Sequence, residues 1–561
     1  MNRRNFLKQT GVMAAALAIP TCKTLGAEKQ SRARREERDN TSRVPKYTFA
    51  NTLKEQEAQL KTNPLMLRFI ESRKKMADDP YRPIYHFVSP ESTLNDPNGL
   101  CFWQGRWHMF YQGYPPEDRR QHWGHAVSDD LIHWCDLPYA IYPNPEHACY
   151  SGATLVEKDR VIAMYHGTRA GNMVAVSSDS LLLNWKKITG KAVIPIRLPD
   201  GSKPPYRVFD PCIWKKDGYY YSLSGGKKPG PGGMSVRANF LFRGKSLAKW
   251  EYLHTFTDND IFSLVGDDGA CPYFWPIGNK HILIHFSHMS GGKYLLGDYD
   301  KKRDKFAPTS AGDFNFGSYR PSAVHAPSAT PDGKGGVIVI FNVNSGWEDE
   351  ITMKSWNQIM SLPRRLTLST EEGFDEVNQE PTGDIESLRY DRVHMENIEL
   401  RPNKEIVMKK VKGNCMETYA KVDTKDSDLI EMRVLRSPKS EEYTRILFYK
   451  DRGYRRDVMK HGIRKKFNSV ISLDISHSST LEEAKRRPAE TGQVLLKEDD
   501  PLRLRVFIDK SIVEVFVNDK QCVAARVYPG RKDSVGVSIQ SVGREAEVLE
   551  LDAWQMKSIY D

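Results

Sequence analysis

One arrangement of hydrophobic and polar positions returns along the chain from about residue 100. A polar turn precedes an apolar, often aromatic strand, and small or polar residues follow it. The strands read WHMFYQG, VIAMYHG, YYYSLSG, HILIHFSH and VIVIFNVN. They return after about 54 to 61 residues, which is long enough for one four-stranded propeller blade. Five returns predict a five-bladed β-propeller over about 80–380, with the chemistry on the innermost strand that opens each blade. The alternative, an all-β protein with ordinary hairpins, would show less even spacing.

The pattern changes after about residue 385. Leu502–Ile508 and Ser511–Val517 alternate apolar and polar residues on either side of Asp509 and Lys510. This predicts a hairpin with a two-residue turn. Similar short strands continue to the end of the sequence, so a β-sandwich is expected over 385–561. The predicted fold class is therefore all-β, a five-bladed propeller followed by a C-terminal β-sandwich.

The first 27 residues have the composition of an export signal. Arg3 and Arg4 precede a short apolar run between Gly11 and Pro20, which is typical of a twin-arginine signal over 1–27. We therefore expect export to the periplasm or the extracellular space. The alternative is a basic N-terminus without a targeting role. For 28–79 we expect a polar linker and a short helix around Leu53–Ala77.

Charge and cysteine usage exclude several classes of protein. The 561 residues carry a formal charge of +11, but no basic stripe typical of nucleic-acid-binding domains occurs in the predicted folded part. Outside the N-terminus, no apolar stretch approaches the ~20 residues of a membrane-spanning helix. The eight cysteines include no CxxC pair, so we expect mostly buried free thiols.

Two aspartates stand in positions suited to chemistry. Asn95–Gly99 reads NDPNG just before the first blade strand, and its proline and glycine predict a tight turn that supports Asp96. Asp210 also precedes a proline, at the start of the third blade. Equivalent places in different blades converge on the axis, and carboxylates about 5 Å apart are the pair that retaining glycosidases use. The alternative for Asp96 alone is an ordinary Asx turn.

Longer segments resemble glycoside hydrolase family 32, the invertases, inulinases and levanases. The family's opening motifs resemble YHFVSPESTLNDPNGLCFWQGRWHMFYQGYP and HWGHAVSDDLIHW. Its later motifs resemble YSGA, VFDP, ACP, SLPRRL and LRVFIDKSIVEVFVND, and all stand in the family's order between Tyr85 and Pro529. The resemblance implies the same propeller and sandwich that the repeat predicts. We expect an oligosaccharide or polysaccharide substrate, no cofactor and no metal.

The resemblance also implies roles for individual residues. Asp96 matches the family nucleophile, and Asp210 matches the aspartate that holds fructose hydroxyls and stabilises the transition state. A fructose-binding subsite would be lined by Asn95, Gln112, Trp123 and Ser151. An indole beside a sugar face and short polar groups beside its hydroxyls suit that purpose.

Two departures from the family's motifs bear on catalysis. Ala270 stands where the family has its acid/base glutamate, and Phe209 stands where it has an arginine. Asp268 and Arg207 lie two residues earlier, and positions i and i−2 of a strand share a face. We therefore expect Asp268 to be a displaced proton donor with a pKa raised by burial, and Arg207 to bind substrate. The alternatives are a loop aspartate without a catalytic role and a proton from the acidic loop Glu348–Glu350.

Two further features receive a structural interpretation. His122, His125 and His133 have no cysteine or carboxylate partner at zinc-binding spacing, so we expect core or hydrogen-bonding roles. Gly225–Gly233 (GGKKPGPGG) is too rich in proline for a phosphate-binding loop and opens no helix. We expect it to form a flexible loop over the mouth of the pocket.

The leading hypothesis is an exported glycosidase that hydrolyses a furanoside, such as a β-fructofuranoside, by a retaining carboxylate mechanism. The intact NDPNG motif favours an enzyme, whereas the missing glutamate favours a non-catalytic carbohydrate-binding relative. A third hypothesis is a glycosidase for another sugar, and an acidic or sulfated one would suit the mildly basic chain. The sequence gives no indication of the oligomeric state.

Overall fold

The computed structural model describes residues 39–560 apart from 317–323, 345–350, 352–354, 372–373, 453–454, 458–464, 486 and 498–499. The predicted export signal and the Glu348–Glu350 loop lie outside the described residues. In the described part, no helix is long and apolar enough to cross a membrane. A single compact unit begins at Asn40.

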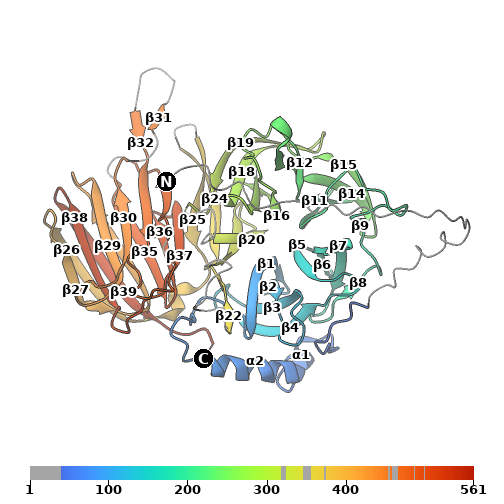
Figure 1. Cartoon of the computed structure of the whole chain (residues 1–561), viewed down its shortest axis with the longest axis horizontal. Coiled ribbons are helices and arrows are strands. Elements are labelled where there is room, and N and C mark those ends of the chain that lie inside the picture. The colour runs from blue at the N-terminus through green and yellow to red at the C-terminus, as the bar shows by residue number, and fades with distance from the viewer. Residues whose placement is uncertain are drawn as a thin grey trace, which may run out of the picture. The chain divides into compact units, whose positions relative to one another are not determined.

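Five sheets, each with four main antiparallel strands, occupy the first two thirds of the described chain (Figure 1). From inside to outside, the blades are β1 (Ser92–Trp103), β2 (Arg106–Gly113), β3 (His122–Ser128) and β4 (Cys135–Ile141); β5 (Cys149–Val156), β6 (Val161–Gly167), β7 (Gly171–Ser177) and β8 (Lys186–Lys187); β10 (Pro211–Lys216), β11 (Tyr219–Ser224), β14 (Phe240–Ser246) and β15 (Lys249–Thr255); β16 (Ala270–Ile277), β17 (Lys280–Ser287), β18 (Gly291–Asp300) and β19 (Lys305–Asp313); and β20 (Val324–Pro331), β21 (Val337–Val343), β24 (Arg364–Glu371) and β25 (Phe374–Pro381).

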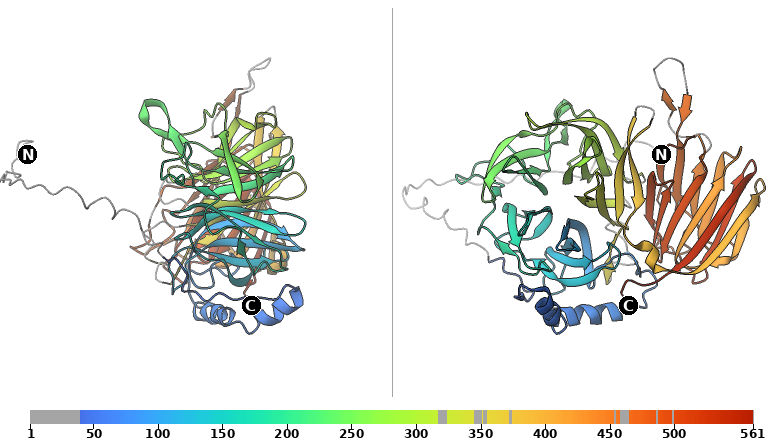
Figure 2. Two further views of the ribbon diagram at one scale, coloured as in Figure 1. Left: turned by 90° about the vertical axis from the view of Figure 1, so that its right-hand side faces the viewer. Right: turned by 180° about the vertical axis from the view of Figure 1, so that it is seen from behind.

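The first strands of the five blades contact one another in a closed ring. Strand β1 contacts β5, β5 contacts β10, β10 contacts β16, β16 contacts β20, and β20 contacts β1. A short strand from the fifth blade, β22 (Trp356–Asn357), pairs in parallel with β1 of the first and closes the ring. Figure 2 shows the blades around their common centre from behind. The predicted five-bladed propeller is confirmed, and its innermost strands open the blades.

The repeated apolar strands of the sequence are the second strands of the blades. They correspond to β2, β6, β11, β17 and β21, and every residue of β6 and β21 is buried. A second strand has neighbours on both sides within its sheet and packs against adjacent blades on its faces, so a continuous apolar run suits it. The chemistry-bearing first strands are more polar and are therefore less visible in the hydrophobic pattern.

Asn95–Gly99 does not form the turn that was expected before the first strand. It lies inside β1, whose pairing with β2 shifts register between Leu94 and Pro97 and again between Asn98 and Cys101. Gly99 has a φ of +51°, and a Cβ there would lie 2.7 Å from the Thr154 side chain. Proline and glycine therefore create a bulged strand here rather than a strand end.

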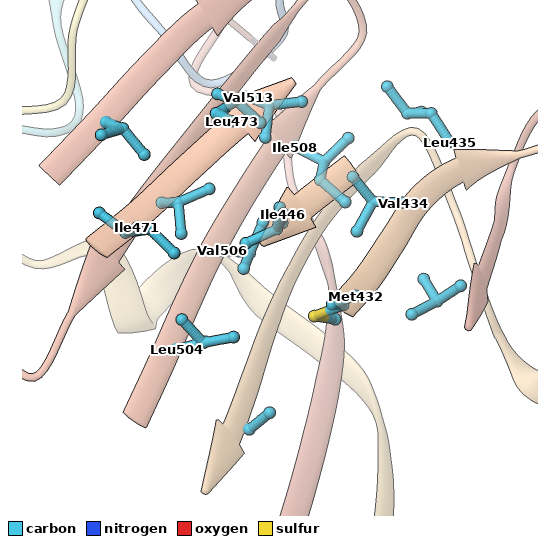
Figure 3. Packing of buried hydrophobic residues seen from close by; sticks show 14 of the residues in the cluster. Met432, Val434, Leu435, Ile446, Ile471, Leu473, Leu504, Val506, Ile508 and Val513 are labelled. Carbon is cyan, nitrogen blue, oxygen red and sulfur yellow. The ribbon is translucent and has the colours of Figure 1, made fainter. Parts of the chain in front are cut away.

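The C-terminal part forms two six-stranded antiparallel sheets, which agrees with the predicted sandwich. One contains β26 (Arg389–Leu400), β39 (Ala546–Met556), β28 (Cys415–Asp423), β35 (Leu502–Asp509), β36 (Ile512–Val517) and β37 (Gln521–Arg526). The other contains β27 (Ile406–Lys412), β38 (Gly536–Val542), β29 (Leu429–Arg436), β30 (Thr444–Tyr449), β33 (Ser469–Asp474) and β34 (Glu490–Val494). Figure 3 shows branched side chains of both sheets filling the space between them, among them Val434, Ile446, Ile471, Val506 and Ile508.

The hairpin of β35 and β36 turns one residue later than expected. Asp509 pairs with Ile512, so the turn consists of Lys510 and Ser511. Lys510 has a φ of +53°, the left-handed conformation that tight hairpin turns require. Asp509 is thereby kept in the ladder, where its carboxylate is fully buried.

The expected helix is divided into two, α1 (Leu53–Leu60) and α2 (Pro64–Lys75). The first helix ends at Leu60 with Lys61 as its C-cap. Asn63 caps the second helix, since its side chain accepts hydrogen bonds from the backbone amides of Leu65 and Met66. Leu67 and Ile70 recur at helical spacing, but they are 51% and 49% exposed and do not form the buried face. The buried face carries Phe69, whose ring packs edge-on against Tyr139 of β4 at 5.8 Å. The break at Asn63 changes the phase of the helical pattern.

A buried ionic cluster joins the propeller to the sandwich. The Arg364 guanidinium of β24 donates to Oε1 of Glu514 in β36 at 3.1 Å, and neither side chain is exposed. His86 contacts both Asp509 and Glu514. Burial alone would lower the pKa of His86, but its two carboxylate partners raise it to about 9. The cluster therefore holds two cations against two buried carboxylates.

Replacing Arg364 with Met is expected to lower the free energy of unfolding by about 3 kcal/mol, because it leaves a buried carboxylate short of a partner. Chemical denaturation would measure the change. Arg531→Met removes an exposed ion pair with Asp533 and serves as the control, with an expected change within about 0.5 kcal/mol. Equal effects of the two substitutions would contradict the interpretation of the cluster.

Candidate active site

Four of the five innermost strands are irregular close to their first residues. Their pairing shifts register between Leu94 and Pro97 in β1, Cys149 and Gly152 in β5, Ala270 and Tyr273 in β16, and Val324 and Pro327 in β20. A bulge re-aims a side chain away from the regular alternation of a strand. The interrupted segments contain Asp96, Ser151, Cys271 and His325, and these four side chains form one connected cluster.

Asp96 lies at the centre of this cluster and is only 8% exposed. Its Oδ2 accepts hydrogen bonds from Ser151 Oγ at 2.5 Å and from Gln112 Nε2 at 3.1 Å. Its Oδ1 lies 3.6 Å from Nδ1 of His325. Burial alone would raise the pKa of Asp96, but His325, Ser151 and the charge of His288 lower it below its ordinary value. Asp96 is therefore a buried carboxylate that stays ionised.

The structure brings Asp210 to the same place. The Sγ of Cys271 lies 3.6 Å from Oδ2 of Asp96 and 3.6 Å from Oδ2 of Asp210, so the two carboxylates are no further apart than twice this distance. The backbone N–H of Cys271 also donates to Asp210 at 3.2 Å. Burial and the charge of Asp96 raise the pKa of Asp210 to about 7. One carboxyl group is thus held ionised, while its neighbour is close to half protonated at neutral pH.

Three of the predicted sugar-binding residues belong to the same hydrogen-bond network. Gln112 Nε2 donates to Ser151 Oγ at 2.7 Å as well as to Asp96, and Asn95 Nδ2 donates to Gln112 Oε1 at 3.4 Å. Asn342 of the fifth blade donates to Asn95 Oδ1 at 3.1 Å. The network orients the amide groups, so their remaining hydrogen-bonding capacity points to a polar ligand.

Profiles of known families match nearly all of the two domains. The glycosyl hydrolases family 32 N-terminal domain matches residues 86–381, and the family 32 C-terminal domain matches residues 384–555. The chain belongs to glycosyl hydrolase family 32. Members of this family are glycosidases, so the two converging carboxylates stand in an enzyme fold.

Curated relatives and solved structures agree with this membership. The levanase of Bacillus subtilis is 25% identical over 520 residues, covering 86% of this chain and 71% of that protein. The insoluble β-fructofuranosidase isoenzyme CWINV1 of Arabidopsis thaliana is 27% identical, covering 86% of this chain and 91% of that protein. Fructan 1-exohydrolase IIa of Cichorium intybus, a crystal structure, has the same fold with a TM-score of 0.73 at 22% identity, covering 86% of this chain and 98% of that one.

Trp123 does not line the pocket as the family resemblance implies. Its side chain has no exposed surface and packs against Phe110 and Tyr165. Its indole N–H donates to the backbone carbonyl of Tyr150 at 2.9 Å. Trp123 therefore supports the strand that carries Ser151 from behind, and the expected contact between its indole and a sugar face is wrong for this structure.

The expectation for Asp268 also needs correction. Strand β16 begins only at Ala270, and Gly269 before it has a φ of +60°, so the shared-face rule for positions i and i−2 does not apply. Asp268 instead accepts two hydrogen bonds from His288, one from its backbone N–H and one from Nδ1 at 2.8 Å. Burial alone would raise the pKa of Asp268, but His288 lowers it. An ionised Asp268 carries no proton to donate.

Arg207 stands in irregular chain before β10, so the strand-face argument fails there as well. Its side chain is exposed, and its role in substrate binding stays a prediction. Phe209, which replaces the family's arginine, is 48% exposed and stacks on His166 with ring centroids 6.0 Å apart. Tyr150 flanks the same imidazole at 6.1 Å. This part of the rim is therefore aromatic.

His288 and His325 were not among the site residues predicted from the sequence. His325 is the second residue of β20, the first strand of the fifth blade, and His288 follows the last residue of β17. The available signals were the polar pair that ends HILIHFSH and a histidine at the start of a blade. Neither signal shows that the two imidazoles lie close together, with ring centroids 6.4 Å apart.

The glycine-rich segment and the histidines singled out in the sequence have structural roles outside the carboxylate cluster. Gly225–Gly233 contributes to a short hairpin, and its first amide donates to the Asp210 carbonyl at 3.1 Å, so its base adjoins the site. His122, His125 and His133 form hydrogen bonds with protein groups, to Ser42, His108 and Asp130. All seven cysteines in the described part of the chain are free thiols, as expected.

Two features outside the site do not alter its assignment. His394, Glu550 and Asp552 of the sandwich place ligand atoms within 4.8 Å of one another, but Arg392 already donates to Asp552 at 2.8 Å. A cavity of about 400 Å³ lies between the chain near Lys46 and the first two blades. Neither contains the paired carboxylates, so the axial cluster remains the candidate active site.

Asp210→Asn is expected to stabilise the fold. In the unfolded chain this carboxyl has a pKa of about 3.9, whereas the folded value is about 7. The folded state therefore keeps a proton that the unfolded state loses between about pH 4 and 7, and this group destabilises the fold increasingly as the pH rises. The substitution should add on the order of 2–4 kcal/mol at pH 8 and little at pH 4. Denaturation at both pH values measures this, with Asp159→Asn on an exposed turn as control. A pH-independent gain would contradict the expectation.

Proposed function

We propose that this chain hydrolyses a fructofuranoside linkage with retention of configuration, with Asp96 as the nucleophile. The observation that carries the proposal is the convergence of an ionised Asp96 and a largely buried Asp210 on the thiol of Cys271 at the propeller axis. Retaining glycosidases use two carboxyl groups about 5 Å apart, and the shared contact with Cys271 limits the separation of this pair to at most twice 3.6 Å. Relatives named as a levanase, a β-fructofuranosidase and a fructan 6-exohydrolase support fructose as the glycosyl unit.

The reaction would follow from the different states of the two carboxyl groups. Asp96 attacks the anomeric carbon as the bond to the leaving oxygen breaks, and a glycosyl ester forms. Water then attacks the same carbon and releases Asp96, so two inversions give net retention. Asp210, with a pKa of about 7, can both donate to and accept from sugar hydroxyls. Pushing the pKa values of neighbouring carboxyl groups apart is how such sites divide roles.

The hydrogen bonds around Asp96 support its role as a nucleophile. Ser151 and Gln112 both bond to Oδ2, whereas Oδ1 has only the longer contact with His325. Oδ1 is consequently the oxygen with electron density available for attack, and the bonds to Oδ2 hold the carboxylate in one orientation. A fixed nucleophile reduces the reorganisation needed to reach the transition state.

One observation favours a second candidate function, a carbohydrate-binding protein without turnover. Ala270 is a buried methyl side chain where the family resemblance implies an acid/base glutamate. Loss of general acid catalysis costs about 10²–10⁴-fold in rate. A protein that binds sugars and cleaves none would be consistent with that loss.

Asp96→Asn should abolish turnover and leave binding intact. The amide has the same shape but is no nucleophile, so a loss on the order of 10⁴-fold or more is expected. Release of fructose from sucrose, short fructans and levan, beside other furanosides, measures turnover, and calorimetry measures binding. Asp159→Asn, on an exposed turn of the second blade, is the matched control. A parent protein that binds these sugars and hydrolyses none would establish the binding function instead.

We also propose export through the paired arginines of the N-terminus. Arg3→Lys together with Arg4→Lys keeps the charge but removes the arginine pair that the twin-arginine route reads. The precursor should then accumulate in the cytoplasm, as shown by cell fractionation and immunoblotting. The control is Lys8→Arg, which leaves the pair intact. Unchanged export of the double variant would indicate another route.

A further inference from the structure

Ala270 stands where the family has its acid/base glutamate, and two polar residues that contact each other, Asp268 and His288, lie beside it. Ala270 pairs with Phe286 in the ladder between β16 and β17. Continuing that antiparallel register by two residues in each chain brings Asp268 opposite His288, just beyond the end of the ladder. The side chains meet there, with Nδ1 of His288 2.8 Å from Oδ2 of Asp268. The fold thus places an imidazole next to the position of the missing acid.

Two contacts with Asp268 fix the imidazole of His288. The backbone N–H of His288 donates to Oδ1 of Asp268 at 3.3 Å, and Nδ1 of His288 contacts Oδ2 of Asp268. One carboxylate therefore holds both the main chain and the ring of His288. The His288 side chain is 55% exposed and that of Asp268 is 18% exposed. The ring therefore lies at the open side of the site, whereas Asp96 and Asp210 lie on its buried floor.

His288 interacts electrostatically with both carboxyl groups of the floor. Its charge helps to lower the pKa of Asp96 and opposes the rise in the pKa of Asp210. Its ring centroid lies 6.4 Å from that of His325, which contacts Asp96 directly. Phe286 packs between them, with centroids 5.1 Å from His288 and 3.9 Å from His325. A glycoside whose anomeric carbon meets Asp96 would direct its leaving group toward this open side.

We propose that His288 is the general acid/base of this site and that Asp268 is its positioning residue. The inference rests on the proposed hydrolysis with Asp96 as the nucleophile. In this assignment His288 takes the role of the glutamate in the family motif. Asp268 orients His288 and, contrary to the expectation from the sequence, does not itself donate the proton.

The proton balance of the two half-reactions is complete. In the first, Nε2–H of protonated His288 gives its proton to the glycosidic oxygen, which takes the electron pair of the breaking bond as Asp96 bonds to the anomeric carbon. In the second, neutral His288 removes a proton from water while the water oxygen attacks that carbon and Asp96 departs. The net reaction adds one water across the glycosidic bond and restores both residues.

The surroundings of His288 favour its protonated form. The hydrogen bond to Asp268 raises the pKa of His288 above its ordinary value, burial opposes this, and the charges of Asp96 and Asp210 raise it further. His325 faces it from β20, and Lys227 of the neighbouring hairpin acts on Asp268. The acid is therefore present at low pH, and activity should fall as the pH rises through the pKa of His288. On the acidic limb of the pH profile, activity should fall as the pH drops through the pKa of Asp96, because the protonated carboxyl group is no nucleophile.

Other groups are less suited to this role. Asp268 is held ionised by His288, and His325 contacts the nucleophile itself. Asp210 is buried with Asp96 and accepts a hydrogen bond from the backbone N–H of Cys271, so it lies on the floor of the site rather than at its open side. The open side of the described site is where an acid for the departing oxygen is needed.

The decisive measurement compares a natural and an activated substrate. His288→Gln should lower kcat for sucrose or a short fructan by about 10²–10⁴-fold. It should have a much smaller effect on the first half-reaction with 4-nitrophenyl β-D-fructofuranoside, whose leaving group needs no protonation. Added azide should accelerate the second half-reaction of the variant and give a fructosyl azide, since azide attacks without a general base. His281→Gln, at the far end of the same strand β17, is the matched control and should resemble the parent.

The positioning role of Asp268 has a separate readout. Asp268→Asn removes the charge that sustains protonated His288, so the alkaline limb of kcat should move to lower pH while KM changes little. A variant that loses activity equally at every pH would contradict this role. The limb should disappear in His288→Gln and persist in the control.

The outcomes separate this inference from the proposed function. If the parent protein hydrolyses none of the substrates, the proposed function fails. If it hydrolyses them and His288→Gln behaves like the parent, the inference alone is overturned. Rescue by the activated leaving group in Asp210→Asn instead of His288→Gln would assign the proton to Asp210. Rescue only in Glu348→Gln or Glu350→Gln would assign it to that acidic loop.

Discussion

The closed ring of five innermost strands, four of them bulged, is the constraint on which the site depends. Each innermost strand is paired on one side only within its blade, and its position is fixed by contact with the first strands of the two neighbouring blades. The bulges then turn Asp96 and Cys271 toward a common axis. Without closure, two carboxylates would separate to relieve their repulsion. With closure, that repulsion appears as the raised pKa of Asp210.

The site is consequently unfavourable for folding and requires support from elsewhere. The thiol of Cys271 separates the two carboxylates with a weak donor, and Ser151 and Gln112 satisfy one oxygen of Asp96. Trp123 holds the strand of Ser151 from behind. Beyond the propeller, the buried cluster around Glu514 and the packed sandwich hold the fifth blade in place. Electrostatic cost at an active site is commonly balanced by such packing.

The features predicted correctly from the sequence are those that leave a regular repeat or a strong motif in it. The spacing of apolar strands predicted five blades, and proline-flanked aspartates predicted both carboxylates, because a repeat and a motif are local properties. The roles of Asp268 and Trp123 were predicted wrongly, since they depend on where β16 begins and on which side of a strand faces solvent. His288 was not predicted as a site residue, because its proximity to Asp268 follows from the register between β16 and β17. Register is set by packing that no single segment encodes.

The two departures from the family motifs become coherent once His288 is included. Replacing an arginine by Phe209 removes a permanent positive charge from the rim, and replacing a glutamate by Ala270 removes an acid that is neutral in its working form. A protonated His288 supplies one positive charge and one transferable proton, so it restores both properties with a single residue. Asp268 is then needed for the same reason that a buried carboxylate accompanies a catalytic histidine in other hydrolases, namely to orient the ring and stabilise its charged form. A cationic acid becomes neutral as it reacts, whereas a glutamic acid becomes an anion beside Asp210. In a site that already holds Asp96, Asp210 and the ionised Asp268, the cationic acid adds no further negative charge.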